Sequence, residues 1–520
     1  MQGLHPGILE ESHRGEIALF FPYAETHFKF RLPWSPLYKP WPEMILDAPF
    51  QVLPGKPFSV YLLVKDADLY PVVIHSLKLR LQDSQGNVVE QEHTLNVSCE
   101  TNLFHQSFSL SREGLRGDIR LWGWITAENA RGKAVRFLCH NFPGLEKRPL
   151  EIRLLEHALP HPQGWFAGEM HCHSEFSSDP VEFGAPLRLM QETANSVGLD
   201  FVLCTDHSYD FNYRRDRFLE FTNADVNFAE YQKQAYALNS ERPDFPTLVP
   251  GEEVSCGNSR GENVHLLVFG HEKFLPGLGD GGRRGFNNHP DLSLTEVLNR
   301  LNGVPTFAAH PKAKIGWLER KIFRRGEWRE EDVVSPSLRG LQFWNGNLGA
   351  DYRDGKAFWI QQLLQGRKIL PIAANDAHGD FNQNIGVKLP LISLYQARSH
   401  VFGKVRTMVP SPTKSIADLR TAFLGESCVC TDGPFVNLTF ENSRVKVEAS
   451  SSGDFGSLQS VVIYGGKTGA QEEVLCKEWR FNEATMGLDE TLPAPVFDYI
   501  RVEAVTRNGN RALSSALFIS

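Results

Sequence analysis

The sequence predicts an α/β fold in which a central β/α barrel is flanked by a β-sandwich-like domain on each side. Three observations predict it. The chain has 520 residues, more than one ordinary core accommodates. Its first and last parts contain short runs of alternating apolar and polar residues, whereas its middle part alternates apolar runs with helical stretches. The predicted domains cover residues 1–160, 161–434 and 435–520.

The N-terminal domain is predicted to be all-β. Runs such as 58–64 and 77–81 alternate between apolar and polar residues, and polar turns such as 83–87 separate them. The residues before about position 50 are rich in proline and aromatic side chains, and proline removes the backbone donor that a helix needs. We therefore expect an extended arm followed by a β-sandwich-like domain.

The central part predicts parallel strands linked by helices. Seven short apolar runs lie at 166–173, 201–207, 247–253, 263–269, 305–310, 340–345 and 369–376. Helical patterns lie between them at 186–197, 227–239, 293–301 and 356–364. A closed parallel barrel carries its active site at the carboxyl ends of its strands. After a last helix at 415–423, alternation returns at 445–449, 461–464 and 499–505, which predicts the C-terminal β-domain.

Composition limits the classes of function. The net charge of −8 argues against nonspecific nucleic-acid binding, which needs a basic surface. No apolar run reaches the length of about 18 residues that a membrane crossing requires, and the first residues lack the basic start and apolar stretch of a secretory signal. The eight cysteines fit free thiols in a reducing compartment. These features predict a cytoplasmic protein with a small-molecule partner, and they leave its oligomeric state open.

The most informative motif is His171-x-His173, because an extended strand directs alternate side chains to one face. Further imidazole and carboxylate groups follow at the ends of later runs. The candidate metal ligands are His171, His173, Asp179, His207, Glu253, His265, His310, Asp376 and His378. A catalytic zinc ion takes about three protein ligands. Nine candidates therefore predict two or three divalent ions, and the mixed donors suit zinc, manganese or iron.

In their order along the chain, these blocks resemble the PHP family, the polymerase and histidinol phosphatase metallohydrolases, over about residues 166–434. The resemblance implies a distorted seven-stranded barrel that holds up to three ions. It implies a first ion on His171, His173, Glu253 and Asp376, a second on Glu253, His265 and His310, and a third on Asp179, His207 and His378. The flanking β regions are more loosely similar to the carbaryl-hydrolase-like branch of these enzymes.

Four other residues have candidate roles. Asp206 is expected to orient a ligand histidine, with direct proton transfer as the alternative. Glu252 is expected to be structural, and a register shift of one residue would exchange it with Glu253. Arg260 and Lys312 lie close to ligand positions and are candidates for substrate contact, with a solvated surface as the alternative.

The predicted function is metal-dependent hydrolysis at a dinuclear or trinuclear centre. Phosphoester hydrolysis is the leading reaction, with an anionic phosphoester as the substrate, because several ions and nearby basic residues suit that chemistry. Hydrolysis of a carbamate, ester or amide is the alternative reaction. A different class also remains, in which the chain is a ligand-binding protein that uses the barrel as a scaffold.

Overall fold

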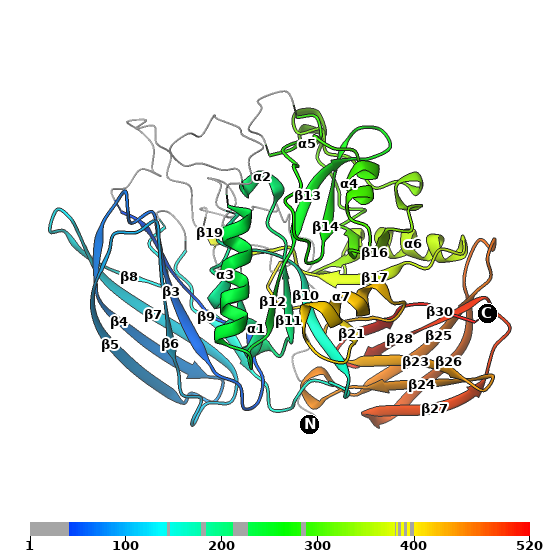
Figure 1. Cartoon of the computed structure of the whole chain (residues 1–520). Helices are drawn as coiled ribbons and strands as arrows, with labels where there is room; N and C mark the ends of the chain where they lie inside the picture. Colours follow the sequence, from blue (N-terminus) through cyan, green and yellow to red (C-terminus); the bar gives the residue numbers. More distant parts are fainter. Residues whose placement is uncertain are drawn as a thin grey trace.

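The computed structural model describes residues 41–142, 146–177, 184–211, 227–281, 288–379, 381–382, 386–388, 393–395 and 400–519. Within these residues it contains thirty β-strands and seven α-helices, so the described chain is mainly β (Figure 1). The predicted N-terminal arm lies outside the described residues up to position 40.

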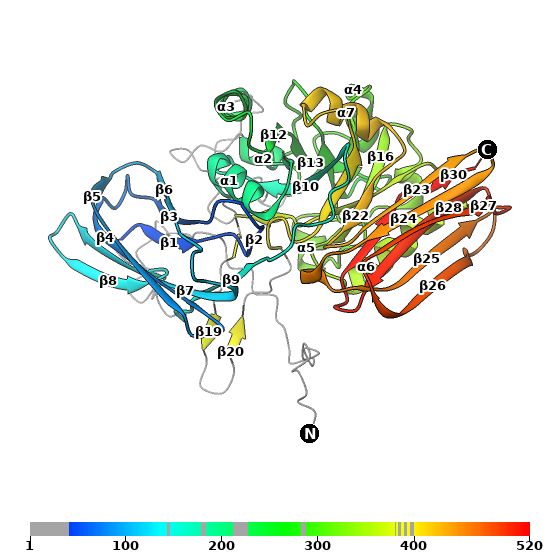
Figure 2. The same ribbon diagram turned by 90° about the horizontal axis from the view of Figure 1, so that it is seen from below.

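The N-terminal strands form two sheets that pack face to face (Figure 2). The first is three-stranded and contains β1 (Glu43–Asp47), β3 (Ser59–Lys65) and β6 (Leu103–Ser109). The second contains β2 (Gln51–Val52), β9 (Leu150–Leu154), β7 (Gly117–Asn129), β4 (Val72–Asp83), β5 (Val88–Cys99) and β8 (Ala134–Leu138). Alternate residues of β4 and β7 are buried, and Leu79 and Ile125 share a core with Leu46 and Leu62 of the first sheet. Burial of these leucine and isoleucine side chains is therefore what joins the two layers.

The predicted closed β/α barrel is wrong, because the central strands divide between two sheets. An eleven-stranded sheet takes β10 (Trp165–His173), β11 (Phe201–Cys204) and β12 (Thr247–Pro250). A five-stranded sheet takes β13 (Glu252–Gly257), β14 (Asn263–Val268), β15 (Thr306–Ala308), β16 (Leu338–Asn345) and β17 (Leu370–Ala374). The predicted run 247–253 is broken at Gly251, between β12 and β13. The PHP-like barrel is therefore not the architecture of this segment.

Several central strands pair antiparallel, and connection length explains the first of these pairs. A parallel pair needs a crossover of about a dozen residues or more, but only residues 258–262 join β13 to β14. These two strands form an antiparallel hairpin, and β14 also pairs antiparallel with β15. At the other sheet, β10 pairs antiparallel with β21 (Arg406–Pro410). Parallel pairing is retained from β10 to β12 and from β15 to β17.

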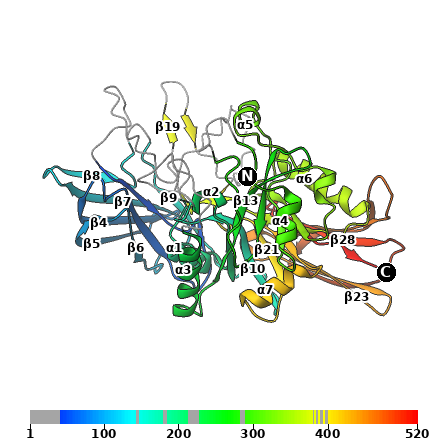
Figure 3. The same cartoon turned by 45° about the horizontal axis from the view of Figure 1, so that its top comes forward.

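The helices lie beside the central strands. They are α1 (Leu187–Val197), α2 (Ser208–Phe211), α3 (Phe228–Glu241), α4 (Leu294–Arg300), α5 (Trp317–Ile322), α6 (Ala350–Leu364) and α7 (Ile416–Leu424). A capping box of Ser293 and Glu296 starts α4, and Gly198 ends α1 in the left-handed conformation with a φ of 77°. Helix α2 lies beside β13 (Figure 3), and α6 packs on β16. None of the described helices has both the length and the apolar character that a membrane crossing requires.

The eleven-stranded sheet continues into the C-terminal part of the chain (Figure 1). Beyond β21 it contains β22 (Val429–Thr431), β29 (Arg511–Ser514), β28 (Tyr499–Thr506), β25 (Leu458–Gly466) and β26 (Val474–Thr485), with β18 (Ala377–His378) and β30 (Leu517–Phe518) at its sides. A separate sheet contains β23 (Phe435–Glu441), β24 (Arg444–Ser450) and β27 (Gly487–Pro493), and β19 (Gly386–Lys388) pairs with β20 (Ser393–Tyr395). Hydrogen-bonded strands thus cross the predicted boundary at residue 434.

Candidate metal centre

Most of the described predicted ligands converge where central strands end, and Glu253 and His265 join them from within β13 and β14. His171 and His173 lie at the end of β10, and the residues that follow β11, β15 and β17 are brought to the same place. The described predicted ligands are His171, His173, His207, Glu253, His265, His310, Asp376 and His378. Asp179 lies outside the described residues. The strand ends therefore meet at one site although the strands do not close into a barrel.

Glu253 is the centre of the cluster. Its Oε2 lies 3.0 Å from His171 Nε2 and 3.1 Å from His207 Nδ1. Its Oε1 lies 2.6 Å from His265 Nδ1 and 3.4 Å from His310 Nε2. Burial raises the pKa of Glu253, but His171 and His265 outweigh this effect, and the pKa is held well below its usual value. Both oxygens thus face imidazole nitrogens, as expected of a carboxylate shared between two ions.

Three sets of donor atoms among the described residues could each hold a metal ion, since the atoms of each set lie within 4.8 Å of one another. They are His171, His173, Glu253 and Asp376; His207, Glu253 and His265; and His173, His207 and His378. The first is the predicted first site. The second contains His207 where the prediction has His310, and the third contains His173 beside the two described members of the predicted third site.

Two polar side chains that the sequence reasoning missed fix the ligand rings. Gln342 Oε1 lies 2.9 Å from His171 Nδ1, and because an amide oxygen only accepts, the ring proton sits on Nδ1 and Nε2 faces the cluster. Asp280 Oδ2 lies 2.7 Å from His265 Nε2, which leaves Nδ1 to face Glu253. Burial raises the pKa of Asp280, but His265 and Arg325 hold it far below its usual value. The only sequence signal for Gln342 is a buried amide inside an apolar strand.

Asp206 supports the turn after β10 and reaches a ligand ring through a serine. Its Oδ1 accepts hydrogen bonds from the Ser174 and Ser177 amides at 2.7 and 3.0 Å. The Ser177 hydroxyl donates to the same oxygen at 2.7 Å and lies 3.3 Å from His173 Nδ1. Because the hydroxyl proton goes to Asp206, the Ser177 oxygen accepts from His173, whose Nε2 then faces the cluster. Asp206 therefore orients this ligand through a serine, and burial raises its pKa.

The neighbouring carboxylate, Glu252, points away from the cluster. It accepts from the Ser208 hydroxyl at 2.6 Å and lies 2.7 Å from His271 Nε2. The register in which Glu253 faces the ligands is therefore the one that the structure contains.

Arg260 and Lys312 contact none of the described ligands. Arg260 is exposed at the tip of the β13–β14 hairpin, where its amide donates to Asn258 Oδ1. The Lys312 ammonium donates to the Trp328 carbonyl oxygen at 2.8 Å and lies 4.0 Å above the centre of the Phe358 ring. Substrate contact by these two residues stays a prediction.

Two cavities border the cluster. The larger has a volume of about 350 Å³ and is lined by His310, Gln342, Lys314 and His400, together with the first residues of α6. The smaller, of about 80 Å³, is lined by His265, His310, Lys314 and Arg325. Basic side chains border the candidate ligands in both cavities: Lys312 and Lys314 line the larger one, and Lys314 and Arg325 line the smaller one.

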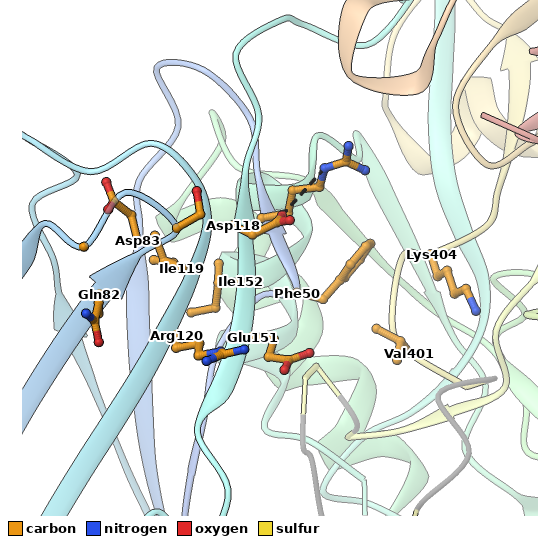
Figure 4. A pocket seen from close by; sticks show the side chains of 13 residues that line it. Phe50, Gln82, Asp83, Asp118, Ile119, Arg120, Glu151, Ile152, Val401 and Lys404 are labelled. Atoms are coloured by element: carbon orange, nitrogen blue, oxygen red, sulfur yellow. Dashed lines mark ion pairs between the residues drawn. The ribbon is translucent and has the colours of Figure 1, made fainter. Parts of the chain in front are cut away.

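A larger cavity lies elsewhere. It has a volume of about 900 Å³, and Asp83, Asp118, Arg120, Glu151 and Lys404 line it without any metal-ligand candidate (Figure 4). Its size does not indicate the site of chemistry, because the converging imidazole and carboxylate groups are at the other cavities.

Comparison with known proteins gives no family. No family model matches the chain, and no curated protein matches it significantly. Among solved structures, a β-D-mannosidase of Dictyoglomus thermophilum is 11% identical over 92% of this chain and 67% of its own, with a TM-score of 0.21. A β-glucuronidase of Parabacteroides merdae is 9% identical over 91% and 65%, with a TM-score of 0.16. A hypothetical protein of Pyrococcus horikoshii is 14% identical over 17% and 88%, with a TM-score of 0.15.

Likenesses with TM-scores this low establish no shared fold, and nothing about the function of this chain follows from them. The fold and the site by themselves define a mainly β protein with buried histidine and carboxylate clusters that could bind metal ions.

Proposed function

We propose that this chain is a metal-dependent hydrolase and that its leading reaction is hydrolysis of a phosphoester. The observation that carries the proposal is Glu253, whose two oxygens face His171 and His207 on one side and His265 and His310 on the other. A ligand shared in this way is typical of adjacent catalytic ions. The order of the ligand blocks, which resembles that of the PHP metallohydrolases, supports the same proposal.

The donor set fits zinc, manganese or iron. These metals bind neutral imidazole together with carboxylate oxygen. Gln342 fixes the tautomer of His171, Asp280 that of His265, and Ser177 that of His173. A neutral ring with one defined free nitrogen is the form in which histidine coordinates a metal.

The chemistry follows from the position of the cluster between the two cavities. Divalent ions held there would lower the pKa of a coordinated water to about 7 and stabilise negative charge on the reacting group. In the larger cavity Lys312 and Lys314 outnumber the one carboxylate, Asp351, so positive charge lies where an anionic substrate would bind. In the smaller cavity Glu319 and Glu327 balance Lys314 and Arg325. The charge of the larger cavity supports a phosphoester as the substrate.

One observation favours the alternative reaction. Phe343 and Tyr352 also line the larger cavity, and aromatic side chains suit an aryl carbamate or ester. No observed feature separately supports a binding protein that lacks catalysis.

The experiment measures bound metal and turnover together. Purified protein is analysed for metal content and then assayed, with added manganese or zinc, on 4-nitrophenyl phosphate, bis(4-nitrophenyl) phosphate and an aryl carbamate. We expect bound metal and hydrolysis of a phosphate ester, and we expect His171→Ala and Asp376→Ala to abolish turnover while the protein stays folded. Absence of bound metal together with absence of turnover on every substrate would overturn the proposal.

A further inference from the structure

We propose that the cavity of about 350 Å³ beside His310 receives the alcohol part of the phosphoester, and that His400 donates the proton that this alcohol needs to leave. The inference rests on the proposed function and names the substrate class of the same site: a phosphate monoester of a small, hydroxylated aliphatic alcohol.

The cavity adjoins the metal cluster. Its wall contains His310, a candidate ligand, and Gln342, whose side-chain oxygen lies 2.9 Å from His171 Nδ1 and 3.3 Å from the His310 amide. A molecule in this cavity is therefore in contact with the residues that hold the reacting centre. The volume lies near the lower end of the range of about 300–1,000 Å³ for small-molecule sites, which suits a small alcohol.

One ring nitrogen of His400 is hydrogen-bonded to the protein backbone. Its Nδ1 lies 2.8 Å from the Asn375 carbonyl oxygen, and because a carbonyl oxygen only accepts, Nδ1 carries a proton in both charge states of the ring. The Nε2 nitrogen is then the one that can exchange a proton with a molecule in the cavity.

The residue that positions His400 is itself fixed. The Asn375 amide donates to Glu169 Oε1 at 3.0 Å, and the Asn375 side chain exchanges hydrogen bonds with the backbone of Val405 at 2.8 and 3.1 Å. From outside the cavity, the Lys404 ammonium donates to Oδ1 of Asn347, a lining residue, at 3.0 Å. The ring of His400 is therefore presented by a braced loop beside the cavity.

The polar lining selects a hydroxylated alcohol. Asn345 Oδ1 accepts from the Gln342 side chain and Asn347 Oδ1 accepts from Lys404, so the amide groups of both asparagines keep donors for a ligand. Asp351, on the same wall, supplies an acceptor. Donors and an acceptor together pair with hydroxyl groups, which both donate and accept.

The proposed step is hydrolysis of the phosphoester bond. A water oxygen forms a bond to phosphorus, and the bond between phosphorus and the alcohol oxygen breaks. The electron pair of that bond goes to the alcohol oxygen, which takes the proton from His400 Nε2. The proton lost by the water passes to solvent, and solvent later reprotonates His400. An aliphatic alcohol is a poor leaving group without this proton, whereas 4-nitrophenolate leaves without one.

The test compares two leaving groups in His400→Gln. A general acid contributes about 100-fold or more to the rate, so kcat/KM for glycerol 2-phosphate should fall by at least this factor. The value for 4-nitrophenyl phosphate should stay within about threefold, since that ester needs no acid. Metal content should equal that of the wild type. The matched control is His75→Gln, which replaces a partly exposed histidine of the N-terminal sheet and should leave kcat/KM for both substrates unchanged.

A second variant tests the cavity itself. Asp351→Ala should raise KM for glycerol 2-phosphate and leave KM for 4-nitrophenyl phosphate unchanged. If kcat/KM of His400→Gln falls equally for both substrates, or for neither, the inference is overturned. In that case a wild type that binds metal and hydrolyses the esters still supports the proposed function. A wild type that binds no metal and cleaves neither ester overturns both.

Discussion

Replacing Asp280 by alanine should weaken metal binding without altering any candidate ligand. Asp280 Oδ2 lies 2.7 Å from His265 Nε2 and 3.0 Å from Arg325 Nε. Without this carboxylate, the His265 ring loses the acceptor that keeps its proton away from Glu253. Loss of such a partner costs about 10- to 100-fold in metal affinity, or about 1.4–2.7 kcal/mol. Asp280→Asn keeps an oxygen that can accept the same proton, so its loss should lie at the lower end.

The assay is a titration of the metal-free protein with zinc in a chelator buffer, with circular dichroism to verify folding. Asp332→Ala is the control, because Asp332 is also buried and accepts from the Ser259 and Arg329 amides at 2.7 and 2.8 Å without contacting the cluster. If folded Asp280→Ala binds zinc as tightly as the wild type, the assignment of Asp280 as the partner of a metal ligand is refuted.

Three further predictions concern stability. Burial raises the pKa of Glu503, but Arg501 and Lys356 outweigh it and lower the pKa from 4.5 to about 2, so this stabilisation is complete above pH 4.5 and is lost as the pH falls toward 2. Glu503→Gln should therefore lower the free energy of unfolding at pH 7 by about 3 kcal/mol, and an unchanged Tm would contradict this. Burial raises the pKa of Asp432 from 3.8 to about 6, so the folded state binds more protons between these values and stability falls as the pH rises through them. Asp432→Asn, which can still accept from the Arg511 amide, should raise the free energy of unfolding at pH 7 by about 2 kcal/mol. Urea titrations of variant and wild type at pH 4 and pH 7 measure this difference, and a variant no more stable than the wild type at pH 7 would contradict it. Removal of metal by a chelator should lower Tm and added zinc should restore it, since an ion that binds only the folded state stabilises it; a Tm that is insensitive to both would count against a resident ion.

The apolar runs indicated where strands lie, but they did not indicate how the strands pair. The run 263–269 contains β14 (Asn263–Val268), yet its antiparallel pairing with β13 follows from the short loop 258–262, which the barrel prediction did not weigh. The pairing of β10 with β21 joins residues more than 200 positions apart, such as Gly168 and Thr407. No local pattern in a sequence encodes a contact of that range.

The candidate metal ligands were visible in the sequence because imidazole and carboxylate groups are rare in buried strands and occur here in a recognisable order. Their supporting residues were not. Gln342 lies far from His171 in sequence, and Asp280 occurs in a glycine-rich stretch with no periodic pattern. Asp206 was expected to orient a ligand histidine, but Ser177, through which it reaches His173, was not foreseen because it lies in a different motif. The type of a residue shows in the sequence whether it can bind a metal, whereas the residue that supports it is determined by the fold.

Backbone conformation gives a separate argument that the cluster binds something. His310 and Asp376 have φ angles of 28° and 53°, in the left-handed region that costs a residue other than glycine about 1–3 kcal/mol. Gln342 accepts from the His310 amide at 3.3 Å, and Glu169 accepts from the amide of Asn375, next to Asp376, at 3.0 Å. Both turns are thus held by buried side chains. A histidine or aspartate that only filled a core would not need this conformation, so the strain at both strand ends favours ligand binding as the reason these side chains point into the cluster.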